Sequence, residues 1–194
     1  MKSILLSIKP EWVKKILNGD KTIEVRKKFP KDYKGWVYIY CTKSQIKEAR
    51  EYFTFEELPR LGKVIARFWC DKVEEIKNLG SYFITWSLNC DELLKNSCLN
   101  WEELFDYLQK PLNRGSSVLG YAIHISALEI VNKELYEFKI YCSKLYSIWA
   151  GKCDRCRRVH IDYEGYLNRC DRRLTKAPQN FVYIEIEQNE KNNI

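Results

Sequence analysis

Residues 7–26 read SIKPEWVKKILNGDKTIEVR, and this stretch predicts how the fold begins. Pro10 suits the first position of a helix, where its missing N–H would have no partner in any case. Apolar side chains then recur at helical spacing between residues 12 and 17, and Gly19 supplies the left-handed residue that commonly ends a helix. From residue 21 to residue 26 polar and apolar side chains alternate, as in a half-buried strand. The stretch therefore predicts a helix, a glycine turn and a strand in close succession.

The remaining sequence predicts mostly strands, with a few helices between them. Regular alternation of strands with helices, which marks a doubly wound parallel sheet, is missing. Asn100 is the expected N-cap of a helix that begins at Trp101. Expected strands cover residues 3–8, 36–41, 64–76, 118–130 and 181–186, and expected helices cover residues 43–53 and 91–110. The pattern predicts the α+β class, with helices packed around a small mixed β-barrel in one domain over residues 1–194.

The composition indicates a globular protein. Of 194 residues, 45% are apolar and 30% are charged, and eight cysteines are too few for a disulfide scaffold. The apolar start of the chain is interrupted by Lys9, which is too early for a secretory signal. The most apolar stretch, residues 118–131, is too short to span a bilayer. We therefore expect a protein of the reducing cytoplasm with no membrane partner.

The net charge of +7 is unevenly distributed. Residues 1–34 hold ten Lys and Arg against four Asp and Glu, and residues 152–176 hold eight against four. If the fold brings these two segments together, they form one positive field that attracts a polyanion such as nucleic acid. An ordinary lysine-rich surface is the alternative, and the sequence leaves both open.

Residues 19–26 match the run G-x-K-x-x-E-x-R of the ASCH domain at every fixed position, and residues 7–10 precede it as expected. The ASCH domain is a relative of PUA and EVE domains. Residues 120–123 and 177–184 also resemble the family, so the resemblance extends from end to end. It is strongest to small ASCH proteins of phages and mobile elements. The resemblance implies a PUA-like barrel whose cleft, beside the first helix, binds RNA or a modified nucleotide.

The chemistry of the motif supports a binding site independently of the family. Glu24 and Arg26 lie two residues apart on one face of the expected strand, so the carboxylate can orient the guanidinium. A guanidinium held in this way presents a planar fork to a phosphate or to a base edge. A purely structural Glu–Arg pair between strands is the alternative. The candidate ligand-binding residues are Lys9, Trp12, Lys21, Thr22, Glu24 and Arg26.

The resemblance also implies two other functions, and the sequence leaves open whether the protein is an enzyme. Some ASCH proteins are ribonucleases, and one subgroup deacylates acetylated cytidine with the run K-T-x-T-x-R. Here Glu24 replaces the second threonine, the nucleophile of that subgroup. A hydrolase would then use Glu24 as general base and Lys21 to stabilise a developing oxyanion. The third possibility is a phage adaptor that binds a host protein through a basic insertion.

That insertion, residues 142–176, contains cysteines at metal-binding spacing. Cys153 and Cys156 form a C-x-x-C pair, a spacing at which two thiolates can hold one metal ion. A further cysteine lies on each side of the pair, which completes a closed tetrahedral zinc site, and longer phage ASCH proteins carry a similar insertion. The expected ligands of this structural zinc are Cys142, Cys153, Cys156 and Cys170. His160 is the alternative to Cys142; a redox pair and free buried cysteines are the other interpretations.

Other aromatic and histidine residues have weaker functional signals. Trp36, Tyr38 and Tyr40 share one face of an expected strand and, with Trp12 and Trp69, could stack bases, although most aromatic residues of such a chain belong to its core. His124 lies within an apolar strand, where we expect a structural histidine with a satisfied hydrogen bond.

Overall fold

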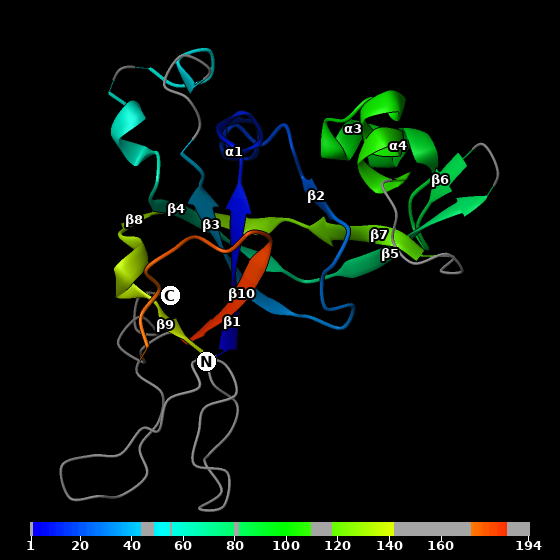
Figure 1. Cartoon of the computed structure of the whole chain (residues 1–194). Coiled ribbons are helices and arrows are strands. Elements are labelled where there is room, and N and C mark those ends of the chain that lie inside the picture. Colours follow the sequence, from blue (N-terminus) through cyan, green and yellow to red (C-terminus); the bar gives the residue numbers. More distant parts are fainter. Residues whose placement is uncertain are drawn as a thin grey trace, which may run out of the picture.

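The computed structural model describes residues 2–43, 49–54, 56–79, 82–109, 118–141 and 172–185, which form two β-sheets and several helices (Figure 1). The six-stranded sheet contains, in spatial order, β8 (Ser126–Lys133), β4 (Val64–Cys70), β3 (Gly35–Cys41), β1 (Lys2–Ile8), β10 (Phe181–Glu185) and β9 (Lys139–Ile140). The four-stranded sheet contains β2 (Ile23–Arg26), β7 (Val118–His124), β5 (Val73–Leu79) and β6 (Tyr82–Ile84). The helices are α1 (Pro10–Leu17), α3 (Cys90–Ser97) and α4 (Trp101–Gln109), with 3-10 turns at Leu58–Arg60 and Leu135–Glu137.

This architecture confirms the α+β class. The strand pairings among the described residues form two sheets and do not close them into one barrel, so the barrel stays a prediction. No helix in the described ranges is long and apolar enough to cross a membrane.

The N-terminal stretch folds as its sequence predicts. Pro10 begins α1, and Gly19 takes a φ of +82° just beyond the end of the helix, in the left-handed region that favours glycine. The chain then enters β2 at Ile23. Because α1 and β2 lie between β1 and β3 in the sequence, those two strands can pair in parallel, with Leu6 opposite Ile39.

The two longest expected strands were wrong in extent, because each is two strands that belong to different sheets. Residues 64–76 divide at Asp71 and Lys72 into β4 and β5, and residues 118–130 divide at Ile125 into β7 and β8. The two breaks lie side by side, since Trp69 pairs with Ser126 on one side and Val73 pairs with Ile123 on the other. No glycine or proline lies at Asp71, Lys72 or Ile125, so the sequence gives no turn signal for this corner.

The single helical region expected at residues 91–110 is two helices. Cys98 ends α3 with a φ of 54°, and α4 begins after Asn100. Each helix starts with a capping box, which joins Asn89 to Glu92 in α3 and the predicted cap Asn100 to Glu103 in α4. The expected helix at 43–53 falls partly on residues outside the described ranges.

Two apolar cores meet at β2. Ile23 and Val25 pack against α3 and α4 in a core that includes Leu93 and Leu104. On its other side, α1 packs on the six-stranded sheet through Val13 and Ile16. The alternating polar residues of β2 therefore face the space between α1 and the helical pair.

Candidate functional site

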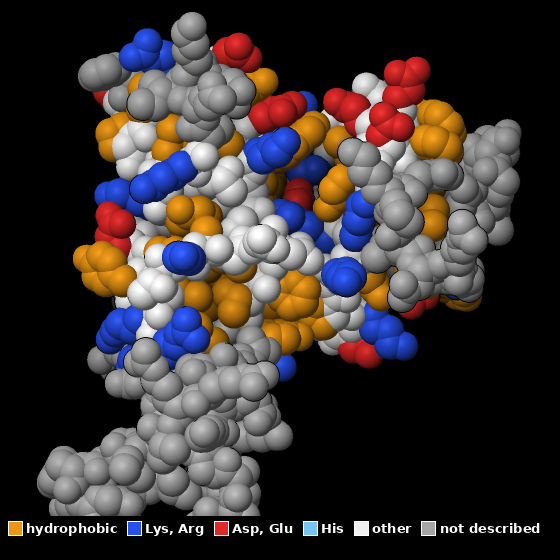
Figure 2. All heavy atoms as spheres, viewed as in Figure 1, with side chains coloured by type: hydrophobic (Ala, Val, Ile, Leu, Met, Phe, Trp, Pro, Cys, Tyr) orange, Lys and Arg blue, Asp and Glu red, His pale blue; other side chains and the backbone are white. Residues whose placement is uncertain are grey.

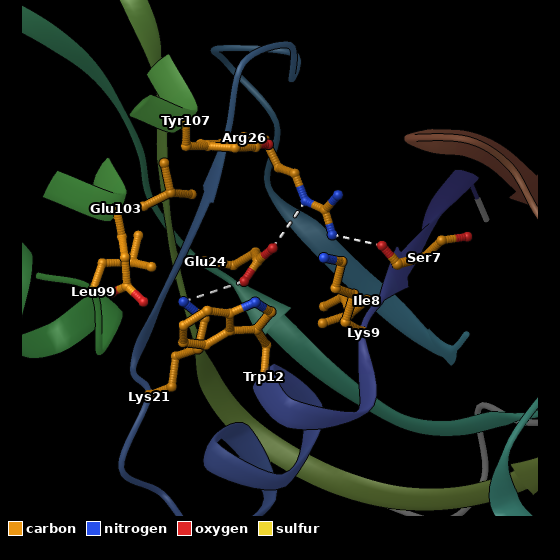
Figure 3. A pocket seen from close by; sticks show the side chains of 11 residues that line it. Ser7, Ile8, Lys9, Trp12, Lys21, Glu24, Arg26, Leu99, Glu103 and Tyr107 are labelled. Atoms are coloured by element: carbon orange, nitrogen blue, oxygen red, sulfur yellow. Dashed lines mark hydrogen bonds and ion pairs between the residues drawn. The ribbon is translucent and has the colours of Figure 1, made fainter. Parts of the chain in front are cut away.

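A cavity of about 330 Å³ occupies this space between the end of β1, α1, β2 and the α3–α4 pair (Figures 2 and 3). Five of the predicted ligand-binding residues line it: Lys9, Trp12, Lys21, Glu24 and Arg26. The sixth, Thr22, is exposed and is not among the lining residues; its backbone N–H donates to the carbonyl of Asn96 and its own carbonyl accepts from Ile125.

Glu24 lies between two cations at the base of the cavity (Figure 3). Its Oε2 is 3.4 Å from Nζ of Lys21, and its Oε1 is 2.9 Å from Nε of Arg26. The side chains are 8%, 2% and 12% exposed for Glu24, Lys21 and Arg26. Together the three carry one net positive charge in a largely water-excluded place, where its effect on an incoming anion is stronger than at the open surface.

Lys21 is held by the C-terminal end of α3 as well as by Glu24. Its Nζ donates a 2.6 Å hydrogen bond to the carbonyl of Ser97, the last residue of that helix, where unpaired carbonyls carry partial negative charge. Nζ also lies 5.1 Å from the ring centre of Trp12. Burial lowers the pKa of Lys21, and the contact with Glu24 opposes that effect. The ammonium is thus fixed in position beside the cavity.

Arg26 is oriented by Glu24 and by the main chain of β1. Its Nη2 donates a 2.7 Å hydrogen bond to the carbonyl of Ser7, whereas its Nε is buried near Glu24 without a well-directed hydrogen bond among the described residues. Ser7 is itself anchored, because its hydroxyl donates to the carbonyl of Pro178 and its N–H donates to that of Asn180. The guanidinium is consequently positioned from both sides.

The α3–α4 pair contributes the wall that sequence reasoning missed. Leu99, Glu103 and Tyr107 line the cavity from this side, and Ser7 lines it from β1 (Figure 3). Burial raises the pKa of Tyr107, whose ring centre is 5.4 Å from Nζ of Lys27. The two Asn-x-x-Glu capping boxes could have located both helices, but no pattern in the sequence places them opposite Glu24.

The aromatic residues considered as base contacts are mostly structural. Tyr38 and Tyr40 are buried in the core, and the guanidinium of Arg67 lies 4.3 Å from the ring centre of Trp36. Trp69 packs edge-on against Trp36. Of this set, Trp12 lines the cavity.

A second buried carboxylate, Glu74 on β5, is surrounded by donors from the β4–β5 connection, β7 and the turn after β6. Its Oε1 is 2.8 Å from Nε2 of His124 and 2.6 Å from Nζ of Lys72, and it accepts a 2.6 Å hydrogen bond from the hydroxyl of Ser87. Its Oε2 accepts from the N–H of Ser87. Burial acts to raise the pKa of Glu74, but hydrogen bonds from Lys72, Ser87 and Thr85 outweigh it and the pKa falls to about 2. His124 therefore has the satisfied contact that its apolar setting predicts.

The expected zinc site lies outside the described residues. This holds for Cys142, Cys153, Cys156, Cys170 and the alternative ligand His160. Within the described ranges, no three His, Cys, Asp or Glu side chains are grouped to hold a metal ion. The described cysteines are free, and burial raises the pKa of Cys41 and Cys70 to about 12, as expected for structural thiols.

Neither a family model nor a curated protein matches the sequence. Among solved structures, the chain is similar to the crystal structure of ASCH from Zymomonas mobilis, with 16% identity and a TM-score of 0.45 over 69% of this chain and 73% of that chain. Two variants of the same protein align with 17% identity and TM-scores of 0.45 and 0.43, over 70% and 69% of this chain and 77% and 74% of theirs. These structural neighbours are ASCH proteins. Residues 19–26 of this chain resemble the motif of the same family.

Proposed function

We propose that the protein binds a nucleotide, free or as part of an RNA strand, in the cavity beside α1. The observation that carries the proposal is the Arg26 guanidinium, which Glu24 and the Ser7 carbonyl hold at the cavity. Nη1 donates no hydrogen bond to any described residue, so this edge of the guanidinium is available to a ligand. A fixed guanidinium edge matches a phosphate or the acceptor atoms of a base.

The rest of the cavity fits the same class of ligand. Its volume of about 330 Å³ lies at the lower end of the range for small-molecule sites. Trp12 offers an aromatic surface, and stacking on such a surface contributes about 1–3 kcal/mol per base. Lys9 is exposed at the cavity and adds positive charge to that of the Lys21, Glu24 and Arg26 cluster. Base and phosphate thus both have a complementary group.

The geometry favours binding over hydrolysis. A general base needs an oxygen directed at a substrate proton. Both oxygens of Glu24 instead face cations of the protein, at 3.4 Å and 2.9 Å. Thr22, whose hydroxyl is the one in the run 19–26, is not among the residues that line the cavity.

Isothermal titration calorimetry with the four ribonucleoside 5′-monophosphates tests the proposal. We expect at least one of them to bind, and Arg26→Ala to weaken that binding by about 1–3 kcal/mol, the scale of a lost charge-assisted hydrogen bond. Arg60→Ala is the matched control, because Arg60 is exposed on the Leu58–Arg60 turn. The proposal is wrong if none of the four binds at millimolar concentration, or if Arg26→Ala and Arg60→Ala bind equally well.

The zinc site is a separate proposal that rests on the sequence. One zinc per chain, held by Cys142, Cys153, Cys156 and Cys170, would be structural, because four protein ligands leave no position for a substrate. Elemental analysis of protein expressed with added zinc should find one equivalent, and Cys153→Ser should lose it. A zinc content near zero in the unmodified chain contradicts the proposal.

A further inference from the structure

We infer that the ligand is one nucleotide of a single-stranded polynucleotide, whose phosphates follow the β2–β3 connection, residues 27–34, and avoid the α3–α4 pair. This inference rests on the proposed function and extends it from a pocket to a path. A base can enter a cavity of this kind when it is unpaired and unstacked, which favours a single strand over a duplex.

The connection starts at the cavity and is tied to both of its walls. Lys27 directly follows Arg26, and its Nζ lies 5.4 Å from the ring centre of Tyr107 on α4. The carbonyl of Lys28 accepts a 3.0 Å hydrogen bond from Nδ2 of Asn180, whose own carbonyl accepts from the N–H of Ser7. A strand that leaves the pocket beside Arg26 therefore meets these residues first.

Beyond the cavity, apolar residues anchor the connection. Phe29 is 5% exposed and packs 5.8 Å from the ring of Tyr33 and 5.6 Å from that of Phe181, centre to centre. The Tyr33 hydroxyl donates a 2.6 Å hydrogen bond to the carbonyl of Trp36. Because the aromatic residues point inward, the exposed lysines at 28, 31 and 34 are displayed from a fixed backbone, which lowers the entropic cost of binding.

Charge distinguishes this side of the cavity from the opposite side. Residues 27–34 contain four lysines and one aspartate, whereas residues 89–109 contain five Asp and Glu and one lysine. The connection leaves β2 on the side away from α3 and α4 (Figure 1), and acidic side chains gather over those two helices (Figure 2). A polyanion is attracted to the first surface and repelled by the second. The path accordingly runs along the connection.

Salt dependence of oligonucleotide binding measures these contacts. The eight residues of the connection span at most about 29 Å, so a ten-nucleotide probe is long enough to follow it. Binding of fluorescein-labelled U10 and dT10 is followed by anisotropy between 50 and 300 mM salt, for the unmodified protein and for the triple variant Lys28→Gln, Lys31→Gln, Lys34→Gln. The slope of log affinity against log salt should be smaller by about 2 in the triple variant, at roughly 0.7 per phosphate contact on a single strand.

The control is a second triple variant, Lys2→Gln, Lys77→Gln, Lys139→Gln, which removes the same number of charges. Its lysines belong to β1, β5 and β9. A slope in this control close to that of the unmodified protein supports the path, and equal slopes in the two triple variants overturn it. Binding of U10 no tighter than that of uridine 5′-monophosphate also overturns it, while the mononucleotide site stands. Binding of neither U10 nor dT10 overturns the path, and the proposed function falls with it only if none of the four 5′-monophosphates binds either. Equal binding of U10 and dT10 identifies contacts to phosphate and base, and preference for U10 adds the 2′-hydroxyl.

Discussion

Glu24 on β2 and Glu74 on β5 are two buried carboxylates of the same four-stranded sheet, and their strands lie on either side of β7. Their side chains nevertheless point to opposite faces of the sheet. Glu24 lies opposite Ile123 and Glu74 lies opposite Ala122, and successive side chains of a strand alternate between the faces. Each carboxylate contacts two basic side chains. A list of buried charges would not distinguish them.

The two carboxylates differ in the other groups that surround them. The donors on Glu74 include the N–H and the hydroxyl of Ser87, so this carboxylate fixes the turn after β6. The cations on Glu24 line a cavity, and the guanidinium of Arg26 keeps an edge that no described residue uses. A buried ion cluster therefore indicates a binding site when its donors exceed what the fold uses, and a structural role when every donor is used locally.

The largest effect is expected at Glu24. In Glu24→Gln, Lys21 stays buried with no carboxylate beside it, and Arg26 loses the group that orients it. Removal of one partner from a buried ion pair typically costs about 3–5 kcal/mol of stability. Urea denaturation should show this loss, and calorimetry should show weakened nucleotide binding in the same variant. Unchanged binding would mean that the cluster is structural, like that of Glu74.

A smaller effect, on stability alone, is expected at Glu74. In Glu74→Gln, Lys72 can turn to solvent because its side chain is already 43% exposed, so the loss is mainly that of hydrogen bonds to a charged acceptor, about 1–3 kcal/mol. Denaturation measures the loss. Nucleotide affinity should equal that of the unmodified protein, and a parallel loss of affinity would show that the two clusters are coupled.

The stability difference between the unmodified protein and Glu74→Gln should depend on pH, because the pKa of Glu74 is depressed. A carboxyl group with a pKa of about 2 in the folded state and about 4.3 in the unfolded state stabilises the protein above the unfolded value. That stabilisation is lost as the pH falls through the folded pKa. The stability gap between the unmodified protein and Glu74→Gln should hence narrow between pH 5 and pH 2. Denaturation curves across this range that keep a constant gap would contradict the assignment.

The smallest effect is expected at Thr22, which the sequence motif includes but the cavity does not. Thr22→Ala should change nucleotide affinity by less than about 0.5 kcal/mol, as for a surface substitution away from any special contact. Calorimetry under the conditions used for Arg26→Ala provides the comparison. A loss as large as that of Arg26→Ala would place the hydroxyl in the site.

The sequence was informative where local rules decide the structure. Pro10 and Gly19 define α1 and its exit, and the alternation of β2 correctly places Glu24 and Arg26 on one face. These features depend on residues within a few positions of each other, so spacing alone predicts them.

Other features depend on distant parts of the chain, and the sequence did not predict them. The corner at Asp71 and Ile125 divides two expected strands with no glycine or proline at either break, so no local turn signal marks it. Likewise, Lys21 donates to the carbonyl of Ser97, which is 76 positions away in the sequence. Tyr107 lines the same cavity and is still more distant from Lys21 in the sequence. Pairing between sheets and packing of α3 and α4 on β2 decide these positions, and neither leaves a periodic signal.

The most direct test compares the two clusters in one NMR titration of ¹⁵N-labelled protein with the 5′-monophosphate that binds best. The Nε–H signal of Arg26, assigned with Arg26→Lys, and the indole N–H of Trp12 report on the cavity; the amide of Ser87 reports on the Glu74 cluster. We expect the Arg26 and Trp12 signals to shift together in a saturable way while the Ser87 signal stays in place. A shift at Ser87 with none at Arg26, or no shift at any of the three, would contradict it.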